Sequence, residues 1–194
     1  MDTHAADSGP TAPEGMTPRT IGVLIGLVVA GGAVSVALGV YGREHSPTGR
    51  AIALFGFATM FDMKVWLATA AACFAGVQLV TALRMYGRIG HGPSPHAVTI
   101  THRVSGVVAI VLTLPVAYHC LWSLGFQTYS RRVLFHSVLG CAFYGIFVTK
   151  MLALKVRRMP GWVVPLLGGA LFTTLMLVWL TSALWYFTHR PPGY

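Results

Sequence analysis

Acidic residues are scarce in this sequence, and none follows residue 62. The chain of 194 residues has 5 aspartates and glutamates against 14 lysines and arginines. The acidic residues are Asp2, Asp7, Glu14, Glu44 and Asp62. Cation carriers and proton pumps normally place a carboxylate within the membrane. The rest of the chain offers none, which argues against those functions and leaves its basic residues without counter-ions from the same segments.

Cysteine is also rare, and recognisable nucleotide or metal motifs are missing. Cys73, Cys120 and Cys141 form no CxxC or Cys/His spacing, so neither a disulfide framework nor a thiolate metal cluster is expected. We interpret the three thiols as small core residues. The chain has no glycine-rich phosphate-binding loop and no internal repeat, and the missing inverted repeat disfavours a solute transporter.

Long apolar stretches are abundant. Hydrophobic residues make up 55% of the chain, charged residues 10%, and the mean hydropathy is +0.66, so the sequence predicts a membrane protein. A helix of about 20 residues crosses a bilayer. We therefore predict an all-α integral membrane protein, a five-helix bundle over residues 19–190. The predicted spans are about 20–41, 64–86, 103–124, 133–154 and 162–187.

Two further segments are assigned by composition. Residues 1–18 are polar and lack the basic start of a signal peptide, so we predict a disordered tail. Residues 51–61, "AIALFGFATMF", are apolar but too short to cross, and are expected to lie in the membrane interface. In the first span, Gly22 and Gly26 have the GxxxG spacing that is typical of close helix packing.

Basic residues lie at the ends of the spans and form no single patch, so nucleic acid is not an expected partner and membrane lipid is. Eight basic residues lie on the side of the N-terminus and six on the other. The excess predicts a cytoplasmic N-terminus and an outside C-terminus. Arginine outnumbers lysine eleven to three beside much Ala, Gly and Val, which fits a GC-rich bacterium and hence a bacterial plasma membrane.

Two histidines lie at matched depth in the third and fourth spans. The midpoint of His119 and His136 falls inside "GFQTYSR", the break between these spans, so an antiparallel hairpin brings both to nearly the same level. Facing imidazoles at one level are what a b-type haem requires. Interhelical hydrogen bonding is the simpler alternative. A copper or zinc site is the weakest alternative, because it needs three or four closely spaced ligands. Cys120 should not supply one, since it is expected to point away from a site that His119 faces.

A third histidine, His102, lies at the start of the third span and has several possible partners. A second haem there could take Met151, Lys150, His91 or His96 as its other ligand, or His102 could simply lie among lipid headgroups. Basic side chains near these positions could neutralise haem propionates or contact lipid phosphates. These are Arg131 and Arg132 on the outer side, and Arg103 and Arg88 on the inner side.

The motifs "THR", "YHC" and "FHS" within residues 101–151 resemble those of small membrane cytochromes b of the cytochrome b561-like type. More closely, the chain resembles an actinobacterial family of five-span proteins associated with Rieske-type iron–sulfur proteins. The likeness covers roughly residues 62–187. It implies one or two haem b groups and transmembrane electron transfer, with a quinone or an iron–sulfur partner. The cytochromes normally supply four histidines, whereas this chain supplies three.

Two functional hypotheses follow. In the first, the chain is a haem b electron-transfer subunit of an oxidoreductase complex, with His119 and His136 as axial ligands. In the second, it is a non-redox membrane anchor or assembly subunit of a respiratory complex, and its histidines only join helices.

Overall fold

The computed structural model describes residues 17–157 and 159–189, and helices are the only regular secondary structure among them. Residues 1–16 of the predicted tail and residue 190 lie outside this range. The elements, in order, are α1 (Pro18–Glu44), α2 (Met60–Met85), α3 (His96–Tyr118), the π-helical turn η1 (His119–Leu124), α4 (Arg131–Ala153), α5 (Val163–Trp179), the π-helical turn η2 (Leu180–Leu184) and α6 (Trp185–His189).

Five segments are long and apolar enough to cross a membrane: α1, α2, α3 with η1, α4, and α5 with η2 and α6. The predicted five-helix membrane fold is confirmed. Large apolar side chains cover the outside of the bundle, among them Val28, Val36, Val107 and Leu166, each more than half exposed. Lipid is the solvent that such a surface requires. The chain is therefore a multi-pass membrane protein whose outer face contacts lipid.

Local sequence signals set the helix ends. Thr17, Thr59 and Ser130 cap α1, α2 and α4, each accepting a hydrogen bond from a backbone N–H in the first turn. The third helix begins at His96, seven residues before the span predicted from hydropathy. Hydropathy marks only the part inside hydrocarbon, whereas the polar turn after Pro95 is helical as well.

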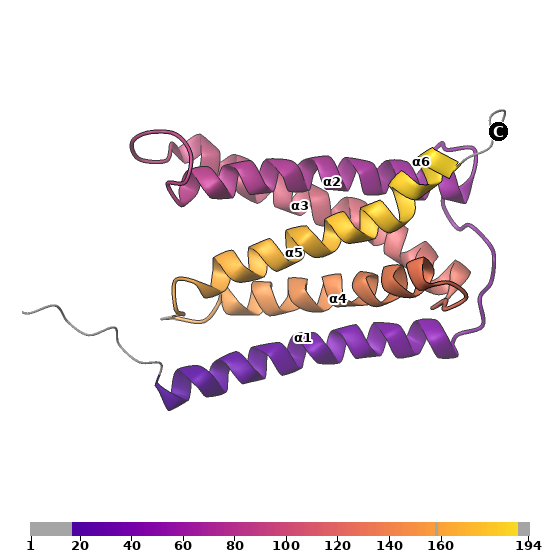
Figure 1. Cartoon of the computed structure of the whole chain (residues 1–194), viewed down its shortest axis with the longest axis horizontal. Helices are drawn as coiled ribbons and strands as arrows, with labels where there is room; N and C mark the ends of the chain where they lie inside the picture. Colours follow the sequence, from indigo (N-terminus) through magenta and orange to yellow (C-terminus); the bar gives the residue numbers. More distant parts are fainter. Residues whose placement is uncertain (1–16, 158, 190–194) are drawn as a thin grey trace, which may run out of the picture.

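Helices α2 to α5 form the bundle, and α1 packs on its outside against α4 (Figure 1). Gly31 of α1 and Gly145 of α4 meet so closely that a Cβ added to either would overlap the backbone carbonyl of the other. Gly22 and Gly26, which carry the GxxxG spacing, have no neighbour within 4 Å of such an added Cβ. α1 contacts α4 instead through the Leu27 carbonyl, which accepts from the Thr149 hydroxyl at 3.3 Å, and through Gly31.

Several connections gather at one end of the bundle, where the short 125–130 loop joins η1 to α4 and where α1 ends and α6 lies. We call it the hairpin end (right in Figure 1). Residues 45–59 connect α1 to α2 there and contain no helix. Their backbone packs on η1, with hydrogen bonds from Gly49 N to Ser123 O (2.9 Å) and from Thr48 N to Trp122 O (3.3 Å). Ile52 and Phe55 are exposed, and α2 begins at Met60.

Candidate functional site

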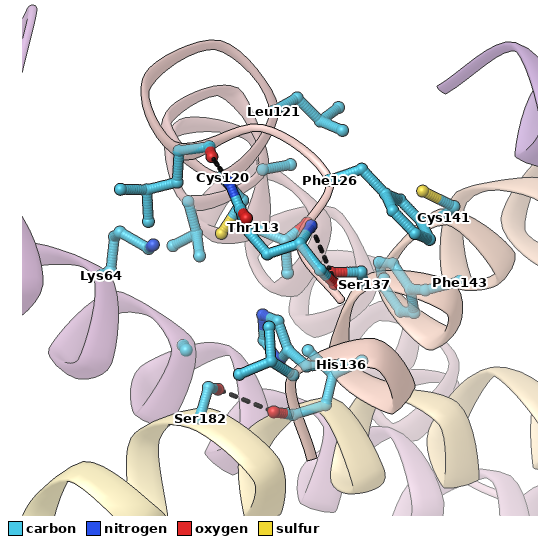
Figure 2. A pocket seen from close by; sticks show the side chains of 18 of the residues that line it. Lys64, Thr113, Cys120, Leu121, Phe126, His136, Ser137, Cys141, Phe143 and Ser182 are labelled. Carbon is cyan, nitrogen blue, oxygen red and sulfur yellow. Dashed lines mark hydrogen bonds between the residues drawn. The ribbon is translucent and has the colours of Figure 1, made fainter. Parts of the chain in front are cut away.

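A cavity of about 460 Å³ opens within the bundle near the hairpin end (Figure 2). All five spans contribute to its wall, from Leu38 of α1 to Leu175 of α5, and the lining is mostly apolar. Among the described residues, no aspartate or glutamate lines it. A volume of this size and an apolar wall with a few polar groups are typical of small-molecule and cofactor sites.

Both π-helical turns border this cavity. η1 contributes Cys120, Leu121 and Leu124 to the wall, and η2 contributes Ser182. η1 follows Pro115, which has no N–H to donate to the preceding turn, and the helix widens four residues later. π turns are rare and occur frequently at functional sites, because they re-aim the side chains of a helix.

His119, the first residue of η1, does not line the cavity and is only 2% exposed. Its Nδ1 lies 2.7 Å from the carbonyl oxygen of Pro115, which can only accept, so Nδ1 carries the proton. Nε2 then accepts a hydrogen bond from the Ile52 backbone N–H at 3.3 Å. Nδ1 is thus bonded to α3 and Nε2 ties the 45–59 connection to η1, so neither nitrogen is directed at a ligand.

Replacing His119 by alanine is expected to lower the free energy of unfolding by about 1–3 kcal/mol, because it leaves the buried Ile52 N–H without its partner and removes the side-chain hydrogen bond to the Pro115 carbonyl. Thermal or denaturant unfolding in detergent measures this. His96→Ala is the matched control, since that histidine is exposed at the start of α3. Equal stability of the two variants would contradict the role given to His119.

His136 of α4 lines the cavity, and its tautomer follows from its neighbours. Its Nδ1 lies 3.3 Å from the Thr181 hydroxyl of η2. That hydroxyl has one hydrogen and donates it to the Leu177 carbonyl at 2.8 Å, so it accepts from His136. The proton of a neutral imidazole is therefore on Nδ1, and Nε2 presents a lone pair to the cavity. An imidazole oriented through its second nitrogen is typical of metal ligands and of general bases.

Cys120 and Lys64 meet His136 across the cavity (Figure 2). The Cys120 thiol lies close enough to His136 and to the amine of Lys64 to interact electrostatically with both. Cys120 and His119 point to different sides of the helix, as the sequence predicted, but the cavity lies on the side of Cys120. The structure therefore brings His136 together with Cys120 and Lys64 and does not bring it together with His119.

The arginines proposed for propionates differ in their surroundings. Arg132 lines the cavity, donates to the Thr181 carbonyl at 2.6 Å and stacks over Trp185 with its guanidinium carbon 3.8 Å from the ring centre. Arg131 and Arg103 are exposed, and neither lines this cavity. Arg132 alone is thus placed to contact a ligand at the cavity mouth.

The other predicted ligands lie toward the opposite end of the bundle. His102 Nδ1 is 2.9 Å from the Thr81 hydroxyl, and the ring is close enough to Lys150 to interact electrostatically. Met151 is half-buried beside Lys150 on α4 and lines no described cavity. Among the alternatives left open for His102, the structure places Lys150 near it and gives His91 and His96 exposed positions.

Sequence reasoning missed Lys64, Cys120 and Thr181 as parts of the site. Lys64 could have been noticed, because it is a cation at the start of a span whose only nearby acid is Asp62. Cys120 and Thr181 gave no signal, since a thiol or hydroxyl in an apolar helix is usually a packing residue. Within the described residues, no group of three or more His, Cys, Asp or Glu side chains is arranged to hold a metal ion.

Comparison with known proteins identified a family for this chain. Searches of curated proteins and of solved structures each found no match. A family model matches residues 23–191, which include most of the first span, the other four spans and the cavity. The chain therefore belongs to the "Family of unknown function (DUF6529)".

Proposed function

We propose that this chain is a quinone-binding membrane subunit that exchanges electrons between a quinone and a redox partner protein. One observation carries the proposal: an apolar cavity of about 460 Å³, within the membrane-spanning bundle, presents the Nε2 lone pair of His136 and the amine of Lys64 to one space. The cavity favours a ligand that is largely apolar and carries a few oxygen atoms.

A quinone has these properties in both redox forms. Its ring and isoprenoid tail suit the apolar lining, and its two oxygens can bond to opposite polar groups. A quinol hydroxyl can donate to Nε2 of His136, while the other oxygen accepts from Lys64. On oxidation, Nε2 can take the hydroxyl proton, which is the role of a general base. Metal cations fit poorly, since two cationic side chains line the cavity and none of the carboxylates within residues 17–157 and 159–189 does.

The bilayer orientation in this proposal follows from the basic residues. Eight basic residues lie on the N-terminal side of the membrane and six on the other side. The loop after α4, on the N-terminal side, contains Lys155 and Arg157. Under the positive-inside rule, the hairpin end and the cavity then lie in the outer half of a bacterial plasma membrane. A redox partner, such as an iron–sulfur protein, would exchange electrons with the quinone from that side.

Haem b is the second candidate, and the orientation of His136 favours it. The fit is partial. His136 presents a correctly directed nitrogen, Arg132 lies at the mouth, and Gly140 of the wall has no neighbour within 4 Å of an added Cβ. His119 does not fit as the opposite ligand, because both its nitrogens are bonded elsewhere. A haem here would be held by one histidine and would supply one-electron chemistry when bound.

Two measurements on the purified protein test these candidates. Titration with short-chain ubiquinone and menaquinone analogues, followed by quenching of tryptophan fluorescence, is expected to show saturable one-to-one binding. Trp185 in the cavity wall is a suitable reporter. A visible spectrum after expression with ample haem shows whether a Soret band is present. If neither quinone binds, the main proposal is overturned. A colourless protein that also binds no quinone would match the non-redox anchor.

A further inference from the structure

A second, smaller cavity lies beyond the first within the bundle. Its volume is about 70 Å³, and residues from α2, α3, α4 and α5 line it. Phe143 and Leu175 line both cavities, and both side chains are buried, at 5% and 7% exposure. With Ala75 they form the packed core cluster of the bundle. A single apolar layer, formed by Phe143 and Leu175, therefore separates the two cavities.

Polar groups line the small cavity on the side away from the hairpin end. They are Gln78 of α2 and Lys150 of α4. The amine of Lys150 lies 3.7 Å from a Cβ built on Gly168, another wall residue, so it is directed at this space. Lysine within a membrane span is costly and is usually functional.

A chain of hydrogen bonds continues from this cavity toward the end of the bundle opposite the hairpin. The Gln78 amide donates to the Ser105 hydroxyl at 2.8 Å and to the carbonyl of His102. His102 in turn contacts Thr81 through Nδ1 and is half-buried. A cavity of this volume with an amide and an amine in its wall is large enough for water. Water in this cavity would link Lys150 to His102, whose ring lies close enough to Lys150 to interact electrostatically, and both side chains can carry protons.

Polar groups also reach the apolar layer from the large cavity. Tyr144, next to Phe143 on α4, lines that cavity, and its hydroxyl lies 2.9 Å from Thr113 Oγ1 and donates to the Thr113 carbonyl at 3.0 Å. Proton-carrying groups therefore end on both sides of Phe143 and Leu175. A hydrophobic constriction between two hydrated spaces is a known means of gating a pore by excluding water.

We propose that the two cavities are halves of one proton path that joins the large cavity to the opposite membrane face, and that the Phe143–Leu175 layer closes it. Along this path the ammonium of Lys150 gives a proton to water beside the layer, and its amine is reprotonated from water on the side of His102. When the layer is dry, the path is closed.

The use of these protons rests on the proposed function. Reduction of a quinone to a quinol takes up two electrons, which the redox partner supplies, and two protons, which the path supplies from the opposite face. Oxidation reverses both flows. Quinone turnover in the large cavity would then move charge across the membrane.

Proton flux in quinone-free proteoliposomes tests the path by itself. A valinomycin-imposed potential drives protons, and internal pyranine reports their entry. Phe143→Ala or Leu175→Ala is expected to raise the flux about tenfold over wild type by letting water cross the layer. Both variants are made so that the test can still be carried out if one of them does not fold. Phe135→Ala, an exposed position on the same helix, is the matched control and should leave the flux unchanged.

Lys150→Met added to the open variant should return the flux to the wild-type level. The path is overturned if both open variants, folded and reconstituted, conduct no faster than wild type, or if Lys150→Met leaves their flux high. It is also overturned if replacing chloride by gluconate abolishes the signal, since an anion would then be the moving species. Quinone binding by the same variants is measured separately, so loss of the quinone site and loss of the path give different results.

Discussion

His136→Ala is expected to weaken quinone binding about tenfold to a hundredfold, because it removes the one ring nitrogen that presents a lone pair to the cavity. Leaving a buried hydrogen-bonding group without its partner costs about 1–3 kcal/mol, and about 1.4 kcal/mol corresponds to a tenfold change in Kd. The same analogue titration as for the wild type measures the effect. Helical content should be unchanged, since the histidine is half-buried and its loss only enlarges the cavity.

Two matched variants make this result specific. His102→Ala removes a half-buried histidine at the opposite end and should leave the Kd unchanged. Thr181→Val keeps the shape of the side chain that orients His136 but removes its hydroxyl, and should weaken binding by a smaller factor. An unaltered Kd in His136→Ala would exclude this residue from the site. If the protein contains haem instead, His136→Ala should remove the Soret band and His119→Ala should not.

Gly145→Ala is expected to destabilise the protein by about 1–3 kcal/mol through the contact between α1 and α4. A Cβ at this position would overlap the hydroxyl of Ser35 and the carbonyl of Gly31, and the latter is backbone that can yield only if α1 moves away. Gly31→Ala should have a similar effect, since its Cβ would overlap Thr149 and the carbonyl of Gly145. Thermal unfolding in detergent measures the loss.

Gly140→Ala is the control on the same helix. No atom lies within 4 Å of a Cβ there, and alanine is the better helix former by about 1 kcal/mol, so stability should be unchanged or slightly higher. Because α1 packs on α4 outside the other helices, Gly145→Ala should lower the melting temperature but change the Kd for quinone little. Equal melting of Gly145→Ala and Gly140→Ala would contradict the close α1–α4 contact.

The glycines of α1 show that a spacing pattern does not predict which residues make a helix contact. Gly22 and Gly26 have the GxxxG spacing, yet they face away from every other described helix, while Gly31, outside that spacing, makes the contact. The GxxxG spacing indicates a helix face made of small residues, and α1 has glycines on more than one face. Which one packs depends on the matching glycine of α4, and that pairing is a property of the assembled bundle.

Sequence by itself determined that the chain is a multi-pass membrane protein with five spans. It could do so because the cost of exposing backbone and polar groups to lipid is set by local composition. The facing directions of the side chains were decided by tertiary structure. The depth of His119 and His136 could be counted along straight helices, but the direction of a side chain turns by about 100° per residue. The wide turn after Pro115, packed against residues 48–52, directs Cys120 at the cavity and buries His119 under that connection.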